Sequence, residues 1–144
     1  MTTKASTGFG TLVKRGQGDT NPGPETFTSI GEMLDITGPG LSRPTIDANN
    51  MQSPNRMEEV ILGMVQTGTV DFDVQYVRGD VQHQGLITDC KAGTLRNFQV
   101  VLGDDPNDPI AFAAYVTKAQ PKYPVAGKRT LSISLKITGD GTGF

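Results

Sequence analysis

Few side chains in this sequence could carry catalytic or metal chemistry, and those few stand apart from one another. The sequence has one histidine, His83, and one cysteine, Cys90. His83 lacks the serine and aspartate partners of a nucleophilic triad, so we interpret it as a surface or packing residue. Cys90 has no second thiol near it, which favours a structural thiol over a nucleophile. One histidine and one cysteine also cannot supply the ligands of a zinc site.

Three other patterns resemble sites but have simpler explanations. The segment 104–109 (DDPNDP) lacks the ligand spacing and closing glutamate of a calcium loop, and its residues are typical of turns. The segment 139–143 (GDGTG) is followed by no lysine or helix, as a phosphate loop would require. Glu58 and Glu59 are adjacent, so on a helix they would diverge by ~100° and could not work as an acid–base pair. The sequence therefore predicts no enzyme, no cofactor and no metal.

Composition points to one mainly β domain. The chain has 144 residues, with 18 glycines and 9 prolines that interrupt most helical stretches. Its net charge is −2, but residues 21–75 carry eight acidic and only two basic side chains. No apolar run reaches the ~20 residues needed to span a bilayer, and the N-terminus has no apolar signal core. We therefore expect a soluble protein made in a reducing cytoplasm.

Several segments alternate apolar and polar residues, as strands with one buried and one solvated face do. In 69–76 the valines, Phe72 and Tyr76 alternate with threonine, aspartates and glutamine, and 130–138 repeats the pattern. Segments 27–36, 95–102 and 110–118 are further predicted strands. One-sided burial is typical of antiparallel sheets, so the predicted fold is a β-sandwich or β-barrel.

One amphipathic helix is predicted over about 54–66. Ser53 would be its N-cap, Pro54 would occupy the first helical position, and Gly68 would follow its end. Apolar residues at helical spacing would form its core face: Met57, Val60, Ile61 and Met64, followed by Val65. The segment 81–90 remains open between a short helix and a turn.

The order of these segments resembles the tail tube (major tail) proteins of long, flexible, non-contractile phage tails, the lambda type. The resemblance covers about residues 27–139. It is carried by IGEMLDITGPGLSRPTID (30–47), SPNRMEEVILGM (53–64), GTVDFDVQY (68–76), FQVVLGDDP (98–106), FAAYVT (112–117) and LSISLKITG (131–139).

The resemblance implies a structural virion protein whose fold is a β-sandwich or barrel flanked by one helix. Six copies would form a ring, and rings would stack into a hollow tube for the passage of viral DNA. A tape measure protein would fill the lumen beforehand, and tail terminator and distal tail proteins would cover the tube ends. The subunit would be made in the host cytoplasm. We expect an N-terminal arm over 1–26, the tube domain over 27–139 and a flexible end over 140–144.

Two surfaces are expected to serve assembly. The polar face of the strand 69–76, with Asp71, Asp73 and Gln75, would line the lumen, where carboxylates repel DNA phosphates and so avoid holding the DNA. The loop 38–53 would contact the adjacent ring together with the N-terminal arm. Its expected contact residues are Leu41, Ser42, Arg43, Asn49, Asn50 and Met51.

Two other interpretations stay open. The chain could be the tube subunit of a related device, such as a gene transfer agent, a contractile tail or a secretion system. It could also be a monomeric β-sandwich binding module, although such modules usually expose an aromatic platform. Here the nine aromatic residues include no tryptophan, and most of them fall within the strand patterns.

Overall fold

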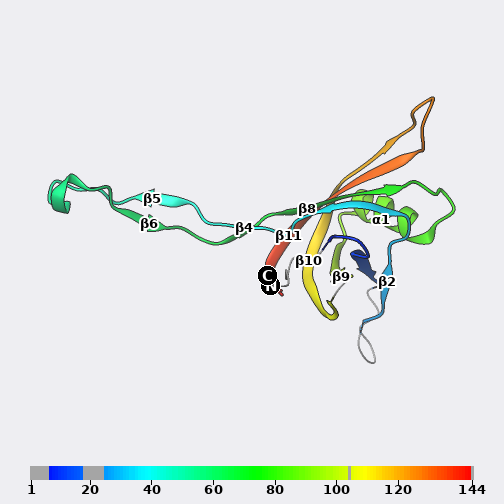
Figure 1. The fold of residues 1–144 in the computed structure, drawn as a ribbon, viewed down its shortest axis with the longest axis horizontal. Coiled ribbons are helices and arrows are strands. Elements are labelled where there is room, and N and C mark those ends of the chain that lie inside the picture. Colours follow the sequence, from blue (N-terminus) through cyan, green and yellow to red (C-terminus); the bar gives the residue numbers. More distant parts are fainter. Residues whose placement is uncertain (1–6, 18–24, 104, 144) are drawn as a thin grey trace, which may run out of the picture.

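The computed structural model describes residues 7–17, 25–103 and 105–143, and it shows one antiparallel sheet, one helix and a long projecting hairpin (Figure 1). The sheet has seven strands in the order β2-β1-β9-β10-β11-β8-β3. These strands are β1 (Leu12–Gly16), β2 (Phe27–Ser29), β3 (Met33–Thr37), β8 (Thr69–Gln75), β9 (Leu95–Leu102), β10 (Asp105–Lys122) and β11 (Thr130–Thr142). The remaining elements are β4 (Leu41–Ser42), β5 (Thr45–Asp47), the 3-10 turn η1 (Pro54–Arg56), β6 (Val60–Leu62), β7 (Gln66–Thr67) and the helix α1 (Val81–Ala92).

The sheet closes on itself because one short segment reaches both of its edges. β2 pairs with β1 at one edge, and β3 pairs with β8 at the other. Between them, the Ile30 amide donates to the Val13 carbonyl, and the Gln75 amide donates to the Glu32 carbonyl. Residues 27–37 therefore bridge the two edges, and we refer to the seven strands with α1 as the barrel.

The barrel encloses a continuous apolar core. On β8 and β11, buried valine, phenylalanine, leucine and isoleucine alternate with residues on the outer face, as the sequence pattern predicts. Each such side chain contributes roughly 1.5–3 kcal/mol by leaving water. The buried cluster consists of Val13, Ile30, Val70, Phe72, Val74, Leu86, Phe98, Val100, Phe112, Ala114, Val116, Leu131, Ile133, Leu135 and Ile137.

The helix predicted over 54–66 does not exist, and the helix of the protein is α1. Residues 54–56 form a single 3-10 turn, and 60–62 and 66–67 are strands. The expected core face is exposed, with Met57, Val60, Ile61 and Met64 all open to solvent. Val60 and Ile61 are β-branched and pair with β5, and Gly63 lies where an added Cβ would come within 2.8 Å of the Pro44 ring. The apolar spacing was compatible with a helix, but the segment pairs as a strand.

α1 begins and ends at clear capping residues. The Asp80 carboxylate accepts hydrogen bonds from the amides of Gln82 and His83, at 2.8 and 3.4 Å. Gly93 follows the helix at φ 68°, a left-handed conformation that glycine adopts without strain. Of the two options left open for 81–90, the helix is correct.

Parts of the expected terminal segments belong to strands of the sheet. Residues 12–16, expected in an N-terminal arm, form β1 in the middle of the sheet order, and residues 140–142, expected in a flexible end, belong to β11. β10 also extends beyond the predicted strand 110–118 at both ends, to Asp105 and to Lys122. Residues 1–6 and 18–24 of the expected N-terminal arm lie outside the described residues, as do Asp104 and Phe144. The domain boundaries stay a prediction.

Candidate assembly surfaces

The segment 41–67, which we call the arm, projects from the barrel as a two-stranded hairpin (Figure 1). Its strands pair as β4 with β7 and β5 with β6. Between these pairs, the Gly63 amide donates to the Pro44 carbonyl, and Arg43 Nε donates to the Gly63 carbonyl at 2.8 Å. The arm is therefore held together by its own hydrogen bonds, and beyond β7, which contacts β11, its strands β5 and β6 pair only with each other among the described residues.

The arm exposes an unusual amount of apolar surface. Its large apolar side chains are all at least about half exposed: Leu41, Ile46, Met51, Met57, Val60, Ile61, Leu62, Met64 and Val65. Contiguous exposed apolar surface of this kind marks interaction sites. An isolated two-stranded hairpin is also only marginally stable in water. The arm thus has the properties of a segment that is completed by a partner.

The six residues expected to contact the adjacent ring all lie on the arm. Leu41 and Ser42 form β4, and Arg43 follows directly. Asn49 and Asn50 organise the distal turn. The backbone N–H of Asn49 donates to the Asp47 carboxylate, and the backbone N–H of Gln52 donates to the side-chain oxygen of Asn50. The sequence placed these residues in a loop of 38–53, whereas the structure shows one half of a hairpin. Its other half, 57–67, is the segment expected to be a helix.

The residues expected to line the lumen share the outer face of β8. Asp71, Asp73 and Gln75 alternate with buried Val70, Phe72 and Val74. Across the β8–β11 pair, Asp71 lies opposite Ser134, whose hydroxyl donates to it, and Asp73 lies opposite Ser132. The structure therefore brings the three residues together, and their position in a lumen stays a prediction.

This outer face carries charges of both signs. Next to β8, Lys136 on β11 lies opposite Thr69 of β8. On β10, the strand beyond β11, Lys118 lies opposite Ser134, and Lys122 lies opposite Thr130. The face therefore has a column of carboxylates on β8, hydroxyls and Lys136 on β11, and a column of lysines on β10. Strand alternation predicted the acidic column, but only the register between distant strands reveals the basic one.

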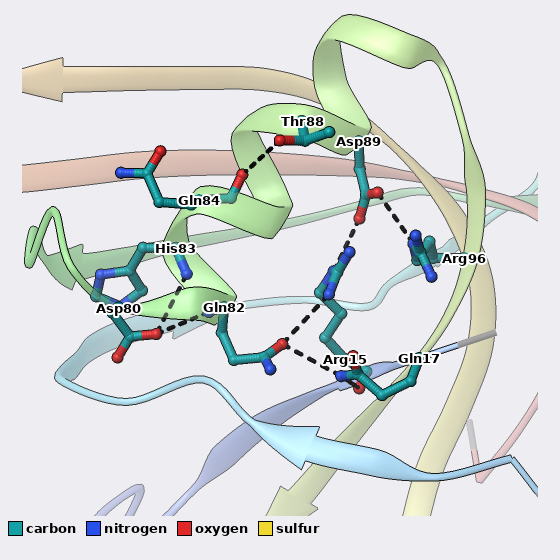
Figure 2. A network of polar contacts seen from close by, with 9 residues as sticks. All are labelled: Arg15, Gln17, Asp80, Gln82, His83, Gln84, Thr88, Asp89 and Arg96. Atoms are coloured by element: carbon teal, nitrogen blue, oxygen red, sulfur yellow. Dashed lines mark hydrogen bonds and ion pairs between the residues drawn. The ribbon is translucent and has the colours of Figure 1, made fainter. Parts of the chain in front are cut away.

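A buried polar network fixes α1 to the sheet (Figure 2). Asp89 on α1 is 2% exposed and accepts from Arg15 Nε of β1 at 2.8 Å and from Arg96 Nε of β9 at 3.0 Å. Gln82 accepts a longer contact from Arg15 at 3.4 Å. Gly85 makes room for this arrangement, because an added Cβ would lie 2.8 Å from Arg15 Cζ. The network joins three elements that are far apart in sequence.

His83 is part of the same packing. Its ring is fully buried, Nδ1 accepts from the Val77 amide at 3.2 Å, and Nε2 lies 3.0 Å from the Gly31 carbonyl. Because the amide can only donate, Nε2 carries the proton and donates to the carbonyl. Both ring nitrogens are used structurally, so the sequence interpretation of a packing residue is correct.

The sequence of this chain matches the family described as lambda phage tail tube protein over residues 12–143. The chain belongs to this family. Tail tube proteins are structural components of the phage virion, which agrees with the expected class of protein. No curated protein sequence matches the chain.

Solved tail structures share the fold of this tail tube protein. A chain in the tail of an empty gene transfer agent particle, resolved with C6 symmetry, superposes with a TM-score of 0.75 at 16% identity, over 96% of this chain and 98% of the other. The tail tube of phage SPP1 gives a TM-score of 0.65 at 18% identity, covering 90% and 73%. A chain of the sheath/tube terminator of an extracellular contractile injection system gives 0.72 at 12% identity, covering 98% and 97%. At these identities the likeness establishes the fold.

Two other features, a metal site and a membrane-spanning helix, are absent from the described residues. Among the described residues, no three His, Cys, Asp or Glu side chains come close enough together to hold a metal ion. The described part of the chain also contains no helix with the length and hydropathy needed to cross a bilayer.

Proposed function

We propose that this tail tube protein assembles into stacked hexameric rings that form a hollow tube for the passage of viral DNA. The observation that carries the proposal is the arm, a hairpin with exposed apolar residues on a chain that otherwise closes its own sheet. In a head-to-tail stack, the arm of one subunit would be covered by the next, and a repeat that does not close along the axis gives a filament. The C6 symmetry of the similar gene transfer agent tail supports six subunits per ring.

The outer face of β8 is proposed as lumen wall. Asp71, Asp73 and Gln75 would face the DNA, and the two carboxylates would oppose the attraction of phosphates to the lysines of β10 and β11 on the same face. A conduit that binds phosphates weakly lets DNA slide, because each lysine contact to phosphate adds salt-dependent affinity. We infer that a tape measure protein occupies this lumen before ejection, and that terminator and distal tail proteins cover the two ends.

Assembly is tested by concentrating the purified protein and imaging it by negative-stain microscopy. Rings and tubes with sixfold end views are expected. A protein that remains monomeric at high concentration, even with its distal tail partner added, would favour the alternative of a monomeric binding module.

The lumen assignment is tested with single-cysteine variants in a Cys90→Ser background. Asp73→Cys should react with a bulky polymer-linked maleimide as a monomer and be protected in long tubes, whose ends alone admit the polymer. Equal reaction in monomers and tubes would place this face on the outside of the tube.

The subunit of a related device is the second candidate. Its support is the similarity to the gene transfer agent tail, which covers nearly all of both chains. The two candidates share the tube and differ in the particle, so mass spectrometry of purified particles from the producing cell separates them by the accompanying head and tail proteins.

A further inference from the structure

A cationic cleft lies where the loop end of the β10–β11 hairpin meets α1. It has a volume of about 450 Å³, and its cations are Arg78, Lys91 and Arg129. Tyr76 and Tyr123 complete its wall, with ring centroids 6.4 Å apart in an edge-on arrangement. No aspartate or glutamate lines the cleft. The site is concave and positive, with two aromatic rings in its wall.

None of the three cations forms an ion pair with another of the described residues. The ion pairs among the described residues are those of Asp89 with Arg15 and Arg96, on the buried side of α1. The sequence around the hairpin offers no acid either, since residues 109–139 contain four lysines and one arginine but no aspartate or glutamate. Such a cleft favours an anionic ligand, and arginine is suited to pairing a carboxylate with two hydrogen bonds.

The far end of the arm carries the opposite charge. Residues 47–59 include Asp47, Glu58 and Glu59 and one base, Arg56. Glu59 is occupied by a hydrogen bond from the Ser53 hydroxyl at 3.0 Å. Glu58 is exposed and takes part in no ion pair that the structure shows, and it lies next to Met57, a side chain that is also exposed. The arm therefore ends in a free carboxylate beside an apolar group.

The arm and the cleft lie at opposite ends of the molecule. In Figure 1 the arm extends to the left along the longest axis, while α1 and the tip of the β10–β11 hairpin lie to the right. The arm of one subunit therefore cannot reach its own cleft. Complementary surfaces at opposite ends are the geometry of a head-to-tail contact, which repeats along an axis without closing.

We propose that the cleft of Arg78, Lys91 and Arg129 receives the acidic arm tip of a second copy of this chain. Glu58 would pair with the cations, and Met57 would pack against the aliphatic and aromatic wall formed by Ile87 and Tyr123. This inference rests on the proposed assembly and adds the receiving site to it. The charge pairing would fix the register of the arm, because complementary charges select the correct contact and disfavour others.

A charge exchange tests the pairing. Glu58→Lys and Arg129→Glu should each raise the critical concentration for tube formation roughly tenfold, which corresponds to ~1.4 kcal/mol per contact. Combining the two reverses the polarity of the pair, so the double variant should return to within about threefold of the original protein. Lys91→Glu serves as a second cleft variant if Arg129→Glu fails to fold, which circular dichroism would show. Lys14→Glu, a cation on β1 outside the cleft, is the matched control and should assemble normally.

Tubes that form normally from both single variants would overturn the docking site while leaving the proposed function intact. A double variant no better than the worse single variant would also overturn it. A third outcome identifies another ligand: if Arg129→Glu loses affinity for DNA at low salt but assembles normally, the cleft binds phosphate instead of the arm. Failure of the original protein to assemble at all would refute the proposed function itself, so the two failures are distinguishable.

Discussion

Ile133 on β11 and Ile61 on β6 are the same residue in the same kind of element, yet one is 1% exposed and the other 55%. Ile133 lies in the barrel, where α1 and the closing segment 27–37 complete a core around it. Ile61 lies in the arm, whose two strands pair only with each other. The comparison shows that pairing of strands alone does not bury side chains. The barrel derives its stability from its own layers, whereas the apolar side chains of the arm are left exposed, and in the proposed tube another subunit would bury them.

Excision of the arm is the most severe test of this division. β4 and β7 pair through Ser42 and Gln66, so residues 43–65 can be replaced by an Asn-Gly turn that suits a two-residue hairpin. We expect the excised protein to fold with nearly unchanged thermal stability and to form no tubes, as seen by circular dichroism and electron microscopy. Normal tubes would show that the arm is dispensable, and an unfolded product would show that the barrel depends on it.

Asp89→Ala should cause the largest loss of barrel stability. It leaves Arg15 and Arg96 as buried or partly buried cations without their acid, and breaking such a pair costs about 3–5 kcal/mol. The free energy of unfolding is best measured by urea titration in the arm-excised background, where assembly does not interfere. Thr88→Ala, on the exposed side of α1, is the control and should change the value by less than about 1 kcal/mol. Similar losses for the two variants would show that the Asp89 network does not hold α1 to the sheet.

The two isoleucines provide a matched pair. Ile133→Ala should lower the free energy of unfolding by about 2–5 kcal/mol, whereas Ile61→Ala should lower it by no more than about 0.5 kcal/mol. Tube assembly should show the reverse order for any Ile133→Ala protein that still folds, with Ile61→Ala the more defective. Equal losses of stability at both sites would mean that the arm is packed against the barrel in solution.

Gly85→Ala should lower the stability of the barrel less than Asp89→Ala or Ile133→Ala. Alanine favours helices by about 1 kcal/mol over glycine, but here its Cβ would press on the guanidinium of Arg15, which Asp89 holds in place. We expect a net loss of about 1 kcal/mol in urea titration. Gly79→Ala has open space around the new Cβ and should be neutral. A stabilised Gly85→Ala protein would show that Arg15 moves aside freely.

The central strands β8 and β11 could be predicted because apolar buried residues alternate with residues on the outer face. The segment 69–76 is the clearest case, since every buried position on β8 is apolar. Apolar periodicity does not predict α1, because most of its buried side chains are polar, namely Gln82, His83 and Asp89. Only its caps, Asp80 and Gly93, signal the helix in the sequence.

The arm was predicted wrongly for a related reason. Apolar spacing over 57–65 fits a helix packed on a core, but in this protein no core lies under it. Gly63 was the available signal against a helix, because glycine is unfavourable in a helix interior. The residues proposed for the lumen and for the contact between rings come from the resemblance and the strand pattern, and their roles stay predictions. The cationic cleft could not, because Arg78, Lys91 and Arg129 come together only when α1 meets the β10–β11 hairpin.

Three glycines at the base of the arm have a mechanical consequence. Gly38 has φ 96°, and a Cβ there would come within 2.5 Å of the Thr69 carbonyl, while Gly68 donates to the Gly40 carbonyl at 2.8 Å. In the proposed tube, each barrel would be connected to the next ring through this glycine joint, where the backbone has fewer steric limits than elsewhere. Curvature of the tail would concentrate at these joints, so the tube could bend without opening a barrel. Gly40 has open space for a Cβ, and alanine there would stiffen the joint and lengthen the distance over which a tail stays straight.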